Sequence, residues 1–248
     1  MQIDWPLIIV LFCLALPGTL IAVPRLINLL LPNNSEELKQ RVSRIAIAQT
    51  ILMILLMSFA GSVLSSRTGL GDPILEGLLQ GQAVLGKMIP IILPLLLITS
   101  GGFLVFIGLY YGLATRILDE KSLQIMRKIR QALRPDGCIL YGGVVEEVFA
   151  RWGLMNVIAF FGILFFGEKN VTVLWSSIFF SGILFTIGQL PAYIAAGCKG
   201  SRPFVYMMLL LNLWLAMLFG WLFWQYGLLA AIIAHMLFHF GWALYDRT

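Results

Sequence analysis

Charged residues are scarce in this chain. Of its 248 residues only 12% are Asp, Glu, Lys or Arg, whereas 60% are hydrophobic. A soluble domain has about a quarter charged residues, so the composition excludes an ordinary soluble fold and predicts a single integral membrane domain over residues 1–248. The net charge of +5 does not indicate nucleic-acid binding, because the apolar segments leave no solvated basic face.

Cysteine and histidine are also rare. The three cysteines, Cys13, Cys138 and Cys198, have no motif spacing, which excludes a disulfide framework or a cysteine-based metal site. The only two histidines, His235 and His239, lie within an apolar segment. The first apolar segment lacks a basic region before it and a small-residue cleavage site after it. We therefore expect a retained span and not a cleaved signal peptide.

Long apolar runs dominate the rest of the chain. Seven are long enough to cross a bilayer, which takes about 20 residues, and they predict an all-α bundle of seven transmembrane helices. An eighth crossing stays open if Phe160–Gly167 forms a separate element. The predicted spans are Trp5–Leu31, Ile45–Leu64, Met88–Leu113, Cys138–Phe166, Val171–Ala196, Phe204–Trp224 and Tyr226–Tyr245.

Basic residues are distributed unequally between the two sides of these spans. In the seven-span arrangement thirteen of the seventeen lysines and arginines fall on the side of the C-terminus, three on the other side, and Arg151 within a span. Lys and Arg concentrate in cytoplasmic loops, so we expect the N-terminus outside and the C-terminus in the cytoplasm. The compact length and the lack of a targeting signal favour a bacterial plasma membrane.

One basic loop has a helical pattern. Apolar residues recur at helical spacing from Leu123 to Leu133, with lysines and arginines around them. This pattern is typical of an amphipathic helix that lies on an anionic leaflet, and Pro135-Asp136-Gly137 is expected to end it.

Three charged residues stand inside the fourth predicted span. They are Glu146, Glu147 and Arg151. A charged group at membrane depth costs about 2.5–3.5 kcal/mol on insertion scales, and such groups usually mark function. Glu147 and Arg151 are four residues apart and can form an ion pair on one helix face. Glu146 is rotated by about 100° from Glu147 and faces elsewhere.

Polar residues on three spans share one depth. At about 1.5 Å per residue, they lie roughly 9–15 Å from the predicted cytoplasmic ends of their helices, and we therefore expect a shared polar cavity. These residues are Glu146, Glu147, Gln189, His235 and His239. Two structural alternatives stay open, a purely structural Glu147–Arg151 ion pair and histidines that only hydrogen-bond between helices.

The same residues resemble motifs of a known family. Glu146-Glu147-Val-Phe-Ala-Arg151 is similar to the E-E-x-x-x-R motif of the CAAX-protease and bacteriocin-processing (CPBP or ABI) family, which includes the Ras-converting endopeptidases. Phe185-Thr-Ile-Gly-Gln189 occupies the place of its F-x-x-x-H motif, with Gln in the His position. His235-Met-Leu-Phe-His239 resembles its late H-x-x-x-N motif. The resemblance covers roughly residues 137–245.

The resemblance implies an intramembrane endopeptidase in which a glutamate activates water. The position of Glu146 matches the general base, and that of Gln189 the partner that helps to activate water. His235 and His239 match the pair that stabilises the oxyanion or holds the substrate, and Arg151 would pair with Glu147 or meet a substrate carboxylate. No cofactor is expected, although two histidines and a glutamate could also hold zinc.

Two other functions stay open. Because glutamine cannot carry a proton, Gln189 is equally compatible with an inactive family member that acts in binding, immunity or scaffolding. Ionisable groups within a bundle also suit a proton-coupled transporter, although the sequence has no internal repeat. The partners expected for a protease are the lipid bilayer and a peptide or membrane-tethered protein. Prenylation of the substrate and the oligomeric state stay open.

Overall fold

The computed structural model of the protein describes residues 3–245, and within them the chain forms helices and no strand. Arg247, counted above among the basic residues, lies outside the described residues. The elements in chain order are α1 (Trp5–Leu30), α2 (Glu36–Thr68), α3 (Pro73–Leu79), α4 (Leu85–Leu109), η1 (Tyr110–Ala114), α5 (Thr115–Ile117), α6 (Glu120–Gly137), η2 (Cys138–Glu146), η3 (Val148–Met155), α7 (Asn156–Phe166), α8 (Val171–Ala195), α9 (Arg202–Tyr226) and α10 (Leu228–Tyr245), where η marks π-helical segments.

Seven helical segments among the described residues are long and apolar enough to span a membrane. The prediction of an all-α polytopic membrane protein is therefore confirmed, and the protein is an integral membrane protein. Phe160–Phe166, the candidate for an eighth crossing, forms the end of α7 and continues the fourth span. α6 runs directly into η2 along the chain, so the helical segment that holds the fourth span extends from Glu120 to Phe166, but it is kinked at Arg134, where φ and ψ are not helical and which precedes Pro135.

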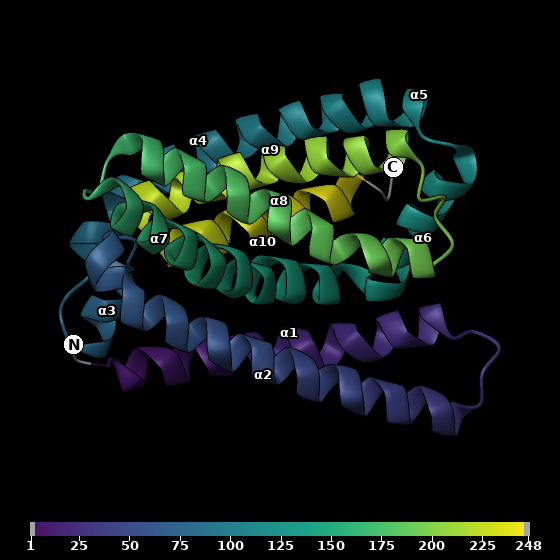
Figure 1. Ribbon diagram of the computed structural model, residues 1–248, viewed down its shortest axis with the longest axis horizontal. Coiled ribbons are helices and arrows are strands. Elements are labelled where there is room, and N and C mark those ends of the chain that lie inside the picture. Colours follow the sequence, from purple (N-terminus) through teal and green to yellow (C-terminus); the bar gives the residue numbers. More distant parts are fainter. Residues whose placement is uncertain (1–2, 246–248) are drawn as a thin grey trace.

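The helices are arranged in layers (Figure 1). α1 and α2 lie side by side along one edge of the molecule and α4 lies along the opposite edge. Between them, α10 packs against η2, α9 and α4, while α8 packs against α9. The segments that carry the predicted site residues therefore pack against one another between these two edges, where side chains from different spans can meet.

Irregular hydrogen bonding marks the middle of the fourth span. η2 ends at Glu146 and η3 begins at Val148, so that both glutamates lie where one π-helical stretch passes into the next. π-helical turns are rare and frequently occur at functional sites. The charged residues in the middle of the fourth span therefore lie in or between π-helical segments, whose hydrogen bonding differs from that of a regular α-helix.

Two glycines in η2 allow α10 to approach closely. A Cβ atom on Gly142 would lie 2.7 Å from Cδ2 of His239, and one on Gly143 would lie 3.2 Å from the Cα of Met236. Both distances are shorter than ordinary carbon contacts of about 3.5–4.0 Å. Only residues without a side chain permit this packing, which brings the histidines of α10 beside η2.

A buried carboxylate holds the start of α10. Asp72 is fully buried and caps α3 by accepting hydrogen bonds from the backbone N–H groups of Ile74 and Leu75. It also accepts a hydrogen bond from the N–H of Leu229, in the first turn of α10. The first N–H groups of a helix have no partner within the helix, so Asp72 satisfies donors of two helices and ties the loop after α2 to α10.

Candidate active site

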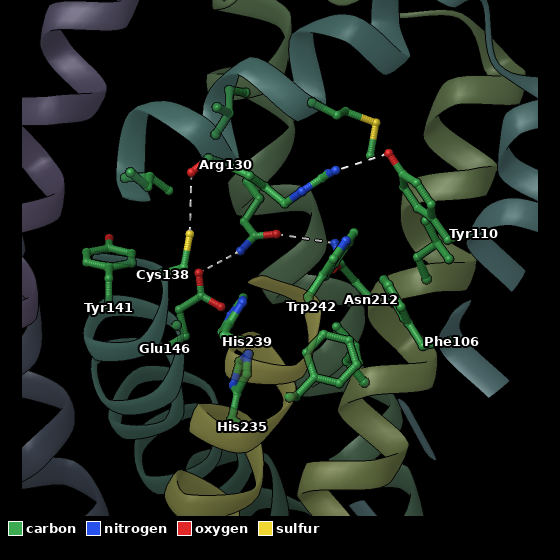
Figure 2. Close-up of a pocket in the computed structure, with 18 of the residues that line it drawn as sticks. Phe106, Tyr110, Arg130, Cys138, Tyr141, Glu146, Asn212, His235, His239 and Trp242 are labelled. Atoms are coloured by element: carbon green, nitrogen blue, oxygen red, sulfur yellow. Dashed lines mark hydrogen bonds between the residues drawn. The ribbon is translucent and has the colours of Figure 1, made fainter. Parts of the chain in front are cut away.

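A cavity of about 140 Å³ receives polar side chains from several helical segments. Glu146 reaches it from η2, Gln189 from α8, Asn212 from α9, and His235 and His239 from α10 (Figure 2). The structure thus brings together four of the six residues singled out from the sequence. Their catalytic roles stay predictions.

A chain of side-chain amides holds Glu146. Gln189 donates through Nε2 to Glu146 Oε1 at 3.2 Å, and Asn212 donates through Nδ2 to Gln189 Oε1 at 3.2 Å (Figure 2). The two bonds agree on the orientation of the Gln189 amide, because its NH₂ group faces the carboxylate and its oxygen faces a donor. Gln189 therefore fixes one oxygen of Glu146, while a carboxylate has acceptor sites left for a water molecule.

Asn212 is a site residue that sequence reasoning missed. It belongs to no motif that we compared, and the sixth span was not expected to contribute to the cavity. The available signal was an isolated amide within the apolar run of α9 from Met207 to Trp214. An amide in such a helix needs a polar partner, and here that partner is Gln189.

Glu147 lies behind the cavity and is completely buried. Its Oε1 is 2.7 Å from Nδ1 of His235, and its Oε2 is 3.3 Å from Nε of Arg151, which is close enough for an ion pair but not aligned as a hydrogen bond. The ion pair expected from the spacing is therefore present. Arg151 also donates to the backbone oxygen of Leu215 at 3.2 Å, which joins η3 to α9.

The bond to Glu147 has a consequence for His235. An ionised carboxylate only accepts hydrogen bonds, so the proton of a neutral His235 lies on Nδ1 and its Nε2 is left as an acceptor. Carboxylates that orient a histidine in this way set its tautomer and its ring direction. Glu147 and Arg151 do not line the cavity; Glu147 contacts His235, which does, and Arg151 is paired with Glu147.

The two imidazoles are stacked. The ring centroids of His235 and His239 are 4.8 Å apart with an interplanar angle of 18°, and Phe219 stacks on the other face of His235 at 4.3 Å. Both histidines line the cavity, as their spacing of four residues on α10 indicated. Among residues 3–245, no group of three or more His, Cys, Asp or Glu side chains is arranged to hold a metal ion.

A cation from α6 also reaches the cavity. The guanidinium of Arg130 lies 4.4 Å from the ring centroid of Trp242 and 5.5 Å from that of Tyr110. All three residues line the cavity (Figure 2). Sequence reasoning treated Arg130 only as part of a membrane-surface helix, because nothing in the local pattern shows that α6 turns this side chain toward the site.

Comparison with known proteins identifies the core of the chain. Residues 137–241 match the family model described as "Rce1-like: Type II CAAX prenyl endopeptidase Rce1-like". The match covers less than half of the chain, and it shows that this segment is similar to the CPBP family. No curated protein and no solved structure matches the chain. The family is one of proteases, and the matched residues include all six predicted site residues as well as Asn212. Arg130 and Trp242 lie just outside the match.

Proposed function

We propose that the protein is an intramembrane endopeptidase that hydrolyses a peptide bond with water activated by Glu146. The observation that carries this proposal is that the two adjacent glutamates have different surroundings. Glu147 contacts His235 and Arg151, whereas Glu146 lines a cavity that is also lined by two imidazoles. A base next to space for water and a substrate carbonyl is what hydrolysis requires.

The residues of the cavity suit the steps of the reaction. Glu146 takes a proton from the water molecule, whose oxygen attacks the carbonyl carbon of the scissile bond. A hydrogen-bond donor on the imidazole of His239 stabilises the negative charge on the former carbonyl oxygen, while His235, whose Nδ1–H is bonded to Glu147, helps to hold the substrate by accepting a hydrogen bond at Nε2. The proton then passes from Glu146 to the leaving amine, the C–N bond breaks, and Glu146 is ionised again.

Gln189 limits how the proton can travel. Its amide holds Glu146 in place but cannot carry a proton at neutral pH, so in this proposal Glu146 both accepts and returns it. The proposed reaction passes through no cofactor and no metal.

The proposed substrate is a peptide or a membrane-tethered protein that enters from the cytoplasmic side. The basic residues around α6 support this orientation, since Lys and Arg concentrate on the cytoplasmic face. A bacterial plasma membrane, with the N-terminus outside, is part of the same proposal.

Gln189 also supports a second candidate function. Because it stands where the family motif has a histidine, the protein could have lost catalysis and kept a binding role in immunity or scaffolding. In that case the cavity would remain a structural relic and Glu146 would be dispensable.

Cleavage of a peptide library by the purified protein separates the two functions. The variants are Glu146→Gln, which keeps shape but removes the base, and Gln189→His. Glu168→Gln is the matched control, because Glu168 is exposed in the loop between α7 and α8. We expect cleavage that Glu146→Gln abolishes, that Glu168→Gln preserves and that a chelator leaves unchanged.

Other outcomes of this experiment are equally informative. Activity only in Gln189→His would show that the native chain has lost its proton carrier. Absence of cleavage by every variant would favour the binding role, and inhibition by the chelator would require a metal in the mechanism.

A further inference from the structure

A second and larger cavity adjoins the site. Its volume is about 770 Å³, within the range of about 300–1,000 Å³ that is usual for ligand pockets. It shares Arg130, Cys138, His239 and Trp242 with the cavity that contains Glu146. Whatever occupies this outer cavity therefore lies directly beside the proposed reaction centre.

The outer cavity is lined by positive charge. Arg127, Arg130 and Arg134 of α6 all contribute to its wall, and no Asp or Glu does so among residues 3–245. The first two are one helical turn apart, so they project on the same side of α6. Several like charges around one hollow attract ligands of the opposite sign, and arginine in particular fits the two oxygens of a carboxylate.

An unsatisfied donor lies in the same wall. The indole Nε1–H of Trp242 is buried and has no hydrogen-bond partner among the described residues, although the side chain lines both cavities. A buried donor without a partner costs free energy. An acceptor oxygen of a bound ligand would satisfy it, beside the guanidinium of Arg130 that lies over the same ring.

The backbone at the rim of the outer cavity is strained. Arg134 has a φ angle of 61°, and it is the one residue other than glycine with positive φ among the described residues. It directly precedes Pro135, where α6 bends. Such conformations cost about 1–3 kcal/mol and concentrate at ligand-binding sites. The bend places Arg134 on the wall of the outer cavity together with Arg127 and Arg130.

We propose that the outer cavity binds a carboxylate of the peptide substrate, so that the enzyme selects peptides with an acidic group near the scissile bond. The inference rests on the proposed function, because it assigns the cavity to the substrate of the same site. A lipid phosphate would satisfy the same arginines. Continuity with the Glu146 cavity favours the peptide, since a lipid bound there would obstruct the substrate.

The test compares pairs of peptides that differ only in charge. One series replaces Asp by Asn at successive positions on both sides of the scissile bond, and another replaces the terminal carboxylate by an amide. The protein is reconstituted in neutral liposomes and compared with Arg127→Gln. Lys128→Gln is the matched control, because Lys128 is a neighbouring exposed cation on α6 that does not line the cavity.

We expect the native protein to prefer the acidic member of one pair through a lower KM. Arg127→Gln should reduce that preference about fivefold, which is the scale of a partly exposed charge pair, whereas Lys128→Gln should preserve it. If both variants lose the preference for the acidic peptide equally, the preference comes from the overall positive charge of the surface, and the assignment to the outer cavity is wrong. If Arg127→Gln keeps the full preference, the assignment is also wrong.

Two further arms keep this proposal separate from the proposed function. Binding of labelled acidic and neutral peptides is measured without catalysis, so a chain that cleaves nothing can still show arginine-dependent selectivity. Anionic liposomes and inorganic phosphate are added as competitors. If Arg127 affects binding of anionic lipid and not the preference between peptides, the occupant is a lipid phosphate and the substrate assignment is wrong.

Discussion

Replacement of Gly142 by alanine tests how the cavity is assembled. The new methyl group would lie 2.7 Å from Cδ2 of His239 and closer still to Nε2. Ordinary carbon contacts are about 3.5–4.0 Å, so the imidazole has to withdraw by about 1 Å. His239 would then leave the position from which it faces Glu146 across the cavity.

A displacement of this size should reduce activity more than stability. Misplacement of a catalytic group by about 1 Å can cost about a hundredfold in rate, whereas overpacking of a buried site costs about 1–3 kcal/mol. We therefore expect kcat of Gly142→Ala to fall by about a hundredfold while the protein remains folded and monodisperse.

The assay combines cleavage kinetics with thermal unfolding. Gly108→Ala is the matched control, because Gly108 is also helical and a Cβ atom there meets nothing within 4 Å. The double variant Gly142→Ala/His239→Ala should recover stability but not activity, since removal of the imidazole removes the overlap. Full activity of Gly142→Ala, or failure of the double variant to recover stability, would refute the close approach of η2 and α10.

Three further changes give distinct results. Asn212→Leu removes the donor to Gln189 and should lower kcat about three- to tenfold with KM nearly constant, as expected for loss of about 0.5–1.5 kcal/mol of hydrogen bonding; an effect on KM alone would contradict a positioning role. Glu147→Gln leaves the buried charge of Arg151 without its counter-ion and should destabilise the protein by about 3–5 kcal/mol in denaturant unfolding. Burial raises the pKa of the Asp72 carboxyl, against the lowering effect of its three backbone donors, so the folded protein holds that proton more tightly than the unfolded chain. Stability should therefore fall as pH rises from the usual pKa of an Asp side chain through the raised one, and Asp72→Asn should remove this dependence in thermal melts.

Hydrophobic patterning was sufficient to predict the membrane architecture. A run of about 20 apolar residues has few alternatives to a transmembrane helix, because every backbone polar group must be satisfied within the bilayer. The seven spans followed from this constraint. The boundaries were less exact, since α2 begins at the Ser35 cap well before its apolar core.

The spacing of residues along the sequence was sufficient to predict which side chains within one helix contact each other. Glu147 and Arg151, and likewise His235 and His239, meet because residues four apart lie on one helix face. Depth along each span also placed Glu146, Gln189 and the histidines in one layer, and the structure brings them to one cavity.

The sequence by itself thus determined the number of spans, the polar layer and the pairs along each helix, all of which depend on hydrophobicity and helical period. Tertiary structure decided that Glu147 engages His235, that Asn212 completes the chain to Glu146, and that Arg130 enters the cavity. These contacts depend on how each helix is rotated about its axis and how closely it approaches its neighbours. The rotation changes across the π-helical stretches, and the approach is permitted by Gly142 and Gly143. Neither quantity is encoded in the period of a single segment, because both are set by the packing of all the helices together.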